Sequence, residues 1–304
     1  FCKPTKSGTI VIEVLEAFMT VLHDIDPVAL PLPFWPHGIH WYGIMYLFGF
    51  AAAFMLGRYR IRAGRFPGID ENRFGDLLFN GMLGVVIGGR VGYVLFYGWS
   101  DFIADPLFLL RINEGGMSFH GGLLGVMAAV AIWSAQSKKH VFDTLDFLVP
   151  LVPPGLMFGR IGNYIGGELW GRYTDKDWGV IFPRAEADLY SQSADQLRVL
   201  HESGLLDRYA RYPSQLVQAA LEGLLLFIIL FWYSRKPRPR YAVSGLFALG
   251  YGVFRFLVEF IRQPDANIGY LAWNWLTMGQ LLSLPLIMLG LVLLWLSRQQ
   301  ESNA

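Results

Sequence analysis

The sequence has little charge for a chain of its length. Only 16% of its 304 residues are charged and 54% are hydrophobic, whereas an average soluble domain carries roughly 25% charged residues. The net charge of +1 argues against a nucleic-acid partner recognised by bulk electrostatic attraction. Together these values indicate an integral membrane protein with several spans.

The sequence also lacks several kinds of catalytic motif. The single cysteine, Cys2, cannot form an internal disulfide, and we expect no catalytic role at this terminal position. The sequence contains no cluster of histidine, cysteine or aspartate residues at metal-ligand spacing. It also contains no nucleophile elbow, no phosphate loop and no dinucleotide fingerprint. We therefore predict chemistry without a metal, a cofactor or a protein nucleophile.

Long apolar runs are what the sequence does contain. A membrane-spanning helix needs about 20 predominantly apolar residues. We predict an all-α integral membrane protein with seven transmembrane helices, near residues 41–58, 76–97, 118–136, 144–163, 214–234, 243–262 and 278–297. Residues 9–22 are apolar but contain Glu13 and Glu16, which favours an amphipathic helix on the membrane surface over a signal peptide.

Basic residues are concentrated in alternate loops, and this predicts the orientation of the chain. The loops after the first, third and fifth helices, together with the C-terminal end, hold twelve of the 25 basic residues. Short cytoplasmic loops carry the excess of lysine and arginine. We therefore expect a periplasmic N-terminus and a cytoplasmic C-terminus.

A long polar loop separates the fourth and fifth predicted helices. Loops longer than about 15 residues are usually functional or disordered, and the tryptophans and tyrosines of this loop argue against disorder. We predict a small folded periplasmic head. The predicted organisation is an N-terminal periplasmic arm with an interfacial helix at 1–40, helices one to four at 41–163, the head at 164–213, helices five to seven at 214–297 and a cytoplasmic tail at 298–304.

Residues 159–172 combine charge and glycine at the end of an almost uncharged segment. The stretch reads Gly-Arg-Ile-Gly-Asn-Tyr-Ile-Gly-Gly-Glu-Leu-Trp-Gly-Arg and places Arg160, Asn163 and Glu168 among five glycines. Charges at membrane depth are costly and usually mark a functional site, while glycine lets the backbone approach a ligand closely. The stretch predicts a site for an anionic molecule at the membrane edge.

Three further polar clusters fall in the outer half of the bilayer under this topology. They are His37-Gly38-Ile39-His40-Trp41-Tyr42-Gly43, Gly115-Gly116-Met117-Ser118-Phe119-His120-Gly121-Gly122, and Tyr251-Gly252-Val253-Phe254-Arg255-Phe256-Leu257-Val258-Glu259. Tyr251, Arg255 and Glu259 have the spacing i, i+4 and i+8, so we expect them on one helical face, which Arg262 continues. Tyr42 is equally typical of an interface anchor.

These polar residues also have structural interpretations. The role of His120 could be merely structural, as a hydrogen-bond partner of a backbone group. Arg255 and Glu259 could form an i, i+4 ion pair in which the two charges neutralise each other. Arg90 lies among glycines, where pairing with a helix-boundary acid such as Asp146 and contact with a ligand are both open.

The chemistry of the clusters indicates a phosphate. Buried arginines with little compensating acid suit this group, because a guanidinium can hold it through two parallel hydrogen bonds. In the outer half of a bilayer the available phosphate is a phospholipid headgroup. Two other classes of protein are an anion or lipid transporter and a seven-helix receptor or scaffold. We find no repeats of the kind that transporters often carry, and a scaffold leaves the polar glycine stretches unexplained.

The stretch beginning at Gly159 closely resembles the signature of bacterial prolipoprotein diacylglyceryl transferases. Further matching motifs are His40-Trp41-Tyr42-Gly43, Gly88-Gly89-Arg90-Val91-Gly92-Tyr93, Gly116-Met117-Ser118-Phe119-His120-Gly121-Gly122, and Phe254-Arg255 through Glu259 to Gln263-Pro264-Asp265. The similarity extends from about residue 36 to 295.

The resemblance implies an inner-membrane enzyme with a seven-helix bundle and an external head. Such an enzyme moves the diacylglyceryl group of phosphatidylglycerol to the thiol of the lipobox cysteine in a prolipoprotein. This forms a thioether and releases glycerol phosphate, in the first step of lipoprotein maturation. The implied partners are phosphatidylglycerol and the signal-peptide lipobox, and we expect a membrane-embedded monomer.

The resemblance also implies roles for particular residues. Arg160 and Arg255 would grip the phosphate and stabilise the leaving glycerol phosphate, and His120 is the candidate for activating the thiol. An arginine field could favour the thiolate instead, and the sequence leaves this open. Tyr42 is the fourth catalytic candidate, and the substrate-binding candidates are His40, Asn163, Glu168, Gly171, Tyr251, Glu259 and Arg262.

One segment departs from the family pattern. The return from the head usually reads His-Pro-Ser/Thr-Gln-Leu-Tyr-Glu, and here it reads Tyr212-Pro213-Ser214-Gln215-Leu216-Val217-Gln218. No role of that His, Tyr or Glu can be carried over. Gln218 can form a hydrogen bond but carries no charge, so the electrostatics of this edge of the site could differ from the family pattern.

Overall fold

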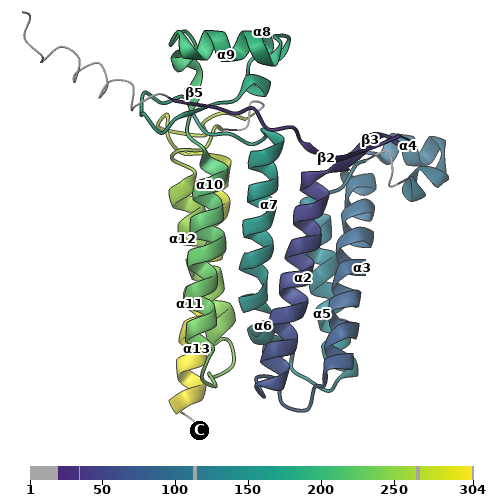
Figure 1. Ribbon diagram of the computed structural model, residues 1–304. Coiled ribbons are helices and arrows are strands. Elements are labelled where there is room, and N and C mark those ends of the chain that lie inside the picture. The colour runs from purple at the N-terminus through teal and green to yellow at the C-terminus, as the bar shows by residue number, and fades with distance from the viewer. Residues whose placement is uncertain (1–19, 34, 112–114, 265–267, 303–304) are drawn as a thin grey trace, which may run out of the picture. The chain divides into compact units, whose positions relative to one another are not determined.

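The computed structural model describes residues 20–33, 35–111, 115–264 and 268–302. Helices dominate these residues, and the strands are short (Figure 1). The strands are β1 Val21–Leu22, β2 Val28–Leu32, β3 Trp35–His40, β4 Val180–Ile181 and β5 Ala210–Arg211. The helices up to the fourth span are α2 Trp41–Arg62, α3 Glu71–Phe96, α4 Trp99–Ala104, η1 Pro106–Leu110, α5 Phe119–Gln136, α6 Val141–Leu148, η3 Val149–Leu151 and α7 Val152–Gly166. The later helices are η4 Pro183–Ala185, α8 Ala187–Tyr190, α9 Ala194–Glu202, η5 Asp207–Tyr209, α10 Ser214–Gln218, η6 Ala219–Leu225, α11 Leu226–Tyr233, α12 Ala242–Val258 and α13 Met278–Ser302.

Six helical segments of the described chain are long and apolar enough to cross a membrane. They are Trp41–Arg62, Glu71–Phe96, Phe119–Gln136, Val141–Gly166, Ser214–Tyr233 and Met278–Glu301. Helix α12 is also apolar but has only 17 residues. The prediction of an all-helical integral membrane protein is confirmed, with six spans of sufficient length.

Helix α12 ends earlier than the sequence predicted. The expected helix ran to residue 262, whereas its last residue is Val258. The amides of Phe260 and Ile261 donate to the carbonyls three residues before them, which tightens the chain into a turn. Glu259 and Arg262 therefore lie in the turn after the helix, and the predicted end of the helix is wrong. The amides of both residues still donate to the carbonyl four residues earlier, and Arg255 and Arg262 both face the carboxylate of Glu259, so these three side chains lie together as expected.

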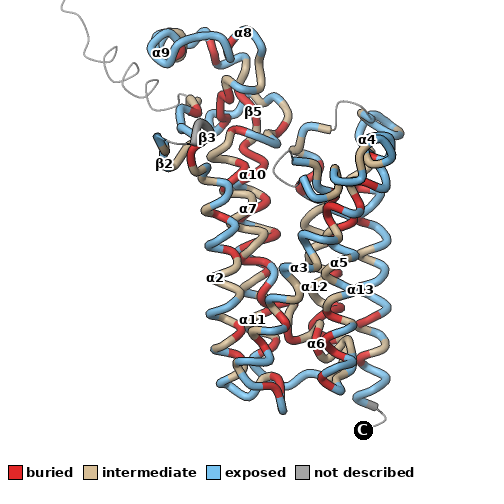
Figure 2. Tube along the Cα trace, turned by 90° about the vertical axis from the view of Figure 1, so that its right-hand side faces the viewer, coloured by how far each residue is buried: buried red, intermediate tan, exposed pale blue. Residues whose placement is uncertain are grey.

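Apolar side chains remain exposed along the long helices. Leu47 on α2, Ile87 on α3 and Met288 on α13 are 67%, 59% and 66% exposed. Pale-blue, exposed residues recur along these helices in Figure 2. Apolar surface of this extent is unfavourable in water and suits contact with lipid.

The chain divides into two compact units. The first unit comprises Phe1–Phe50, Pro153–Ile229 and Ala248–Leu289, and the second comprises Ala51–Val152, Leu230–Phe247 and Gly290–Ala304. The second unit has an apolar core around Phe66, Phe74, Trp133 and Phe147. In the same unit, α3 and α5 approach each other so closely that a side-chain carbon at Gly88 would lie 2.4 Å from the carbonyl oxygen of Gly121.

Arg90 has a structural role in the second unit. It is buried and donates hydrogen bonds to the carbonyl oxygens of Phe108, Leu109, Gly115 and Gly116. Asp146 instead accepts hydrogen bonds from the amide and the hydroxyl of Ser244. The suggested Arg90–Asp146 pair is therefore wrong, because backbone carbonyls occupy the guanidinium.

The first unit contains a small folded layer within residues 180–211. Its apolar core consists of Ile181, Leu189, Leu197, Leu206 and Ala210. Strand β1 pairs in parallel with β4, which pairs antiparallel with β5, so an N-terminal strand completes this sheet. In Figure 1, α8 and α9 lie beyond the ends of α7 and α10. Most of the helix predicted over 9–22 lies outside the described residues, and its last two residues form β1.

Candidate active site

Arg160 and Asn163 lie in the last two turns of α7. The amide of Glu168 donates to the carbonyl of Asn163 at 2.9 Å, which closes the helix in a tight turn. Gly167, inside this turn, has a φ of +64°, in the left-handed region that favours glycine. Asn163 is buried and Glu168 is exposed. The glycines of this stretch thus end the helix and turn the chain directly after Arg160.

The first turn of the fifth span holds the loop that follows α7. The hydroxyl of Ser214 donates to the carbonyl of Leu169 at 3.1 Å, and Nε2 of Gln215 donates to that of Glu168 at 2.6 Å. Both donors have no exposed surface. The position of Glu168 is therefore fixed through its backbone, and its carboxylate remains accessible.

Gly171 lies between two other backbone segments. Its amide donates to the carbonyl of Tyr212 at 2.9 Å. A side-chain carbon at this position would lie 2.4 Å from that oxygen and 2.6 Å from the carbonyl oxygen of Ile261. Close backbone packing accounts for the glycine, and a contact between Gly171 and substrate stays a prediction.

Glu259 joins two arginines at the end of α12. Its Oε2 lies 2.9 Å from Nη1 of Arg255 and 3.8 Å from Nη1 of Arg262. The carboxylate is buried, and Gly279 of α13 makes room for it, since a side-chain carbon there would lie 2.6 Å from Glu259. The i, i+4 pair considered from the sequence is present, but Arg262 also faces the same carboxylate.

Arg160 has open hydrogen-bonding capacity. Within the described ranges its guanidinium forms no hydrogen bond, and its only ion-pair contact is with Oε2 of Glu222 at 3.9 Å, beyond hydrogen-bond distance. The charges of Arg160, Arg255 and Arg262 all act on Glu222. We name these three arginines with Glu222 and Glu259 the arginine cluster.

Glu222 is not among the site residues predicted from the sequence. This residue lies in the fifth span and has no exposed surface. The signal was present, because a lone acid inside a transmembrane segment usually faces the interior of the protein and has a function.

Two tyrosines stand near the arginine cluster. The ring of Tyr42 lies against α7 close to Arg160, since a side-chain carbon at Gly162 would be 3.1 Å from it. Tyr251 lies one turn before Arg255 on the same helix, α12. His40 ends β3 directly before α2 and is exposed.

His120 belongs to the second unit, whereas the other candidate residues belong to the first. It lies in the first turn of α5 and is exposed. The hydroxyl of Ser118 caps this helix by accepting from the amide of Gly121 at 3.2 Å. A partnership between His120 and the arginine cluster stays a prediction.

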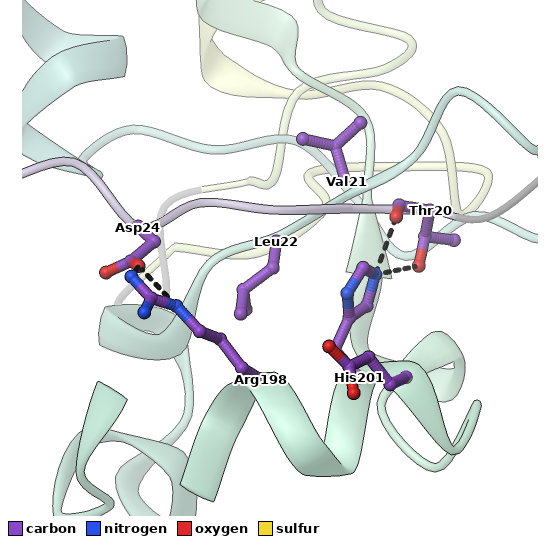
Figure 3. Close-up of a pocket in the computed structure, with 7 residues that line it drawn as sticks. Thr20, Val21, Leu22, Asp24, Arg198 and His201 are labelled. Carbon is purple, nitrogen blue, oxygen red and sulfur yellow. Dashed lines mark hydrogen bonds and ion pairs between the residues drawn. The ribbon is translucent and has the colours of Figure 1, made fainter. Parts of the chain in front are cut away.

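A surface pocket of about 400 Å³ lies between β1 and α9 (Figure 3). Its polar side chains are largely paired with each other. Arg198 contacts Asp24 at 2.6 Å, and Nε2 of His201 donates to the carbonyl of Thr20 at 2.6 Å. These contacts fasten the N-terminal strand to α9, so we assign this pocket a structural role.

Six apolar helices long enough to span a membrane, together with the largely buried arginine cluster, indicate a multi-pass membrane protein with a charged site. The model of a family described as prolipoprotein diacylglyceryl transferase matches residues 27–296. Curated relatives carry the name phosphatidylglycerol–prolipoprotein diacylglyceryl transferase. One from Xanthomonas campestris pv. campestris (strain B100) is 60% identical over 281 residues, which cover 92% of this chain and 94% of the relative. Those from Xanthomonas euvesicatoria pv. vesicatoria (strain 85-10) and Xanthomonas axonopodis pv. citri (strain 306) are 59% identical over the same shares. The chain belongs to the prolipoprotein diacylglyceryl transferase family.

Proposed function

We propose that this chain transfers the diacylglyceryl group of phosphatidylglycerol to the lipobox cysteine of prolipoproteins, the first step of bacterial lipoprotein maturation. The family and the names of its 60% identical relatives support this activity. The structural observation that carries it is Arg160, a largely buried guanidinium without a hydrogen bond in the described part of the chain. Such a group suits a phosphate, which it can hold through two parallel hydrogen bonds.

The proposed reaction is a displacement at carbon. The cysteine sulfur forms a bond to the glyceryl carbon that bears the phosphate ester, and the carbon–oxygen bond of that ester breaks. The electron pair leaves with glycerol phosphate, and the thiol gives up its proton. Negative charge on the phosphate therefore grows during the step. Arg160 and Arg255 would stabilise the transition state, in which this charge is larger, more than the ground state. A fixed cationic site accelerates a reaction in this way.

His120 is our proposed acceptor for the thiol proton. A thiol with a pKa of about 8.5 is mostly protonated at neutral pH, so a base increases the fraction of reactive thiolate. His120 is exposed in the first turn of α5, where a peptide could reach it. If His120→Gln transfers at the wild-type rate across the pH range, the arginines alone favour the thiolate.

The remaining candidate residues would surround the headgroup of phosphatidylglycerol. We propose that Tyr42, Asn163, Glu168 and Tyr251 orient it, and that His40, Gly171, Glu259 and Arg262 belong to the surrounding wall. Glu259 would act by holding Arg255, which it contacts at 2.9 Å.

We further propose a monomer in the inner membrane with seven spans, a periplasmic N-terminus and a cytoplasmic C-terminus. The seventh span would be α12, whose 17 residues extend about 26 Å, slightly less than the hydrocarbon core. Residues 164–213 would form the periplasmic head, where prolipoproteins arrive.

The activity can be tested with the purified full-length protein in phosphatidylglycerol micelles. A lipobox peptide should gain the mass of one diacylglyceryl group on its cysteine, and a matched peptide with serine in its place should gain none. Movement of lipid between the leaflets of vesicles, with no change in the peptide's mass, would indicate a transporter instead.

A further inference from the structure

One face of the fifth span is polar and fully enclosed. Its polar residues have no exposed surface and fall at positions i, i+1, i+4 and i+8 along the span: Ser214, Gln215, Gln218 and Glu222. Farther along the same face, Leu226 and Leu230 are equally buried but apolar. The polar part of the face therefore does not extend along the whole span, and it ends beside the arginine cluster.

The two halves of this polar face differ in their hydrogen bonds. Ser214 and Gln215 hold the loop after α7 through its carbonyls. In contrast, both polar atoms of the Gln218 amide and both oxygens of Glu222 lack a hydrogen-bond partner among the described residues. Buried polar groups are nearly always paired, with protein or with another molecule, because an unpaired one destabilises the fold. We therefore expect Gln218 and Glu222 to form hydrogen bonds with a molecule outside the described chain.

The local fold brings this face to Arg160. Residues Ala219–Leu225 form a π-helix, a rare conformation that is frequent at functional sites. A side-chain carbon at Gly223 would lie 2.5 Å from Cβ of Met157, so the π-helix touches α7 one turn before Arg160. This close approach places the carboxylate of Glu222 at 3.9 Å from the guanidinium.

The unpaired atoms specify the chemistry of the missing partner. An amide offers both a donor and an acceptor, and a carboxylate offers acceptors, which together match hydroxyl groups. Glu222 would repel an anion, and the three arginines that act on Glu222 would repel a cation. A neutral polyol satisfies both conditions.

We propose that Gln218 and Glu222 form a subsite for the hydroxyl groups of a polyol headgroup, and that this subsite selects the donor lipid. This inference rests on the proposed function, in which Arg160 holds the phosphate. A phosphate bound there lies one guanidinium away from Glu222, so the alcohol attached to it lies beside that carboxylate, and Gln218 stands about one helical turn before Glu222 on the same face.

The test compares two donor lipids with the same acyl chains, using the full-length protein and a lipobox peptide. Phosphatidylglycerol carries two headgroup hydroxyls, and phosphatidyl-n-propanol has the same three carbons without any. We expect wild-type kcat/KM to be at least about tenfold higher for phosphatidylglycerol, because a site built to bind a hydroxyl rejects an analogue that lacks it.

Gln218→Met keeps the approximate volume of the side chain and removes its amide. It should reduce this preference to within about twofold, by lowering kcat/KM for phosphatidylglycerol only. Ser214→Ala is the matched control, because Ser214 lies on the same face but already donates to Leu169. Its preference for phosphatidylglycerol should match that of the wild type.

Three results would overturn the inference. They are a wild type without preference, a Gln218→Met variant that keeps the wild-type preference, and a Ser214→Ala variant that loses it to the same extent. If Gln218→Met does not fold, Glu222→Met, which removes both carboxylate acceptors, replaces it, and an unchanged preference there is equally contradictory. A wild type that transfers from neither donor would instead overturn the proposed function, and this inference with it.

Discussion

Arg90 and Arg160 show how the surroundings of a residue decide its role. Both are arginines in glycine-rich transmembrane helices. Arg90 donates to four backbone carbonyls, which use its hydrogen-bonding capacity for structure. Arg160 forms no hydrogen bond in the described part of the chain and has only a distant carboxylate beside it. Of the two, Arg160 is therefore the one with donors available for a phosphate.

At the same scale, Gly171→Ala should damage the site through the backbone. The added carbon would lie 2.4 Å from the carbonyl oxygen of Tyr212, and overpacking of this kind costs about 1–3 kcal/mol. Thermal unfolding in detergent and the transfer rate should both decrease. The control is Gly159→Ala, where no atom lies within 4 Å of the added carbon, so its stability should stay equal or increase. Equal behaviour of the two variants would contradict the close packing at Gly171.

His23 should make the stability of the first unit depend on pH. Burial lowers the pKa of this imidazole below its ordinary value, and the nearby charge of Arg184 acts in the same direction. Its Nε2 donates to the carbonyl of Tyr164 at 2.7 Å, a contact that opposes part of this lowering of the pKa. The unfolded chain binds a proton as the pH falls through about 6.5 while the folded chain does not, so stability is full above that pH and decreases below it.

Stability should therefore be lower at about pH 5.5 than at about pH 7.5. His23→Gln retains a donor for Tyr164 but cannot titrate. Thermal unfolding of both proteins at about pH 5.5 and about pH 7.5 isolates the contribution of the histidine. An identical change with pH in both proteins would show that His23 is not the group responsible.

At the scale of elements, glycine controls how closely α3 and α5 approach. A side-chain carbon at Gly84 would lie 2.5 Å from the carbonyl oxygen of Gly125, and one at Gly121 would lie 2.3 Å from that of Gly88. Small residues allow such backbone contact in membranes, where helices associate mainly through packing. Because α5 begins next to His120, this contact also positions the proposed base relative to α3.

Gly88→Ala should therefore separate the two helices and destabilise the second unit by about 1–3 kcal/mol. Gly81→Ala is the matched control on α3, since no atom lies within 4 Å of its added carbon. The unfolding temperature in detergent should decrease for Gly88→Ala only. A wild-type value for Gly88→Ala would mean that the helices do not need their close contact.

Hydropathy was sufficient to place the helices, but it could not predict contacts between distant segments. The fourth span was expected at 144–163 and extends over Val141–Gly166, a difference of three residues at each end. The end of α12 was missed because it depends on a distant segment: Arg172 binds the carbonyls of Ile261, Arg262 and Glu259. The acceptors of Arg90 are backbone carbonyls, which no pattern of side chains reveals.

At the scale of the whole molecule, the distribution of basic residues predicts which side faces the cytoplasm. Single cysteines can test this in a Cys2→Ser background, at Ser191 in the proposed head and at Lys236 in the loop after α11; both positions are exposed. A membrane-impermeant maleimide should label Ser191→Cys in spheroplasts, and Lys236→Cys only after permeabilisation. The opposite pattern would reverse the proposed orientation.

The central claim is that Arg160 and Arg255 hold the phosphate of the donor lipid. The most direct measurement is the rate of diacylglyceryl transfer from phosphatidylglycerol to a lipobox peptide by Arg160→Ala and Arg255→Ala. Each should lose at least about a thousandfold in rate, because each removes a cation from the site of growing charge. Arg198→Ala, which removes an exposed arginine paired with Asp24, should transfer at close to the wild-type rate. Near-normal rates for both Arg160→Ala and Arg255→Ala would contradict the account.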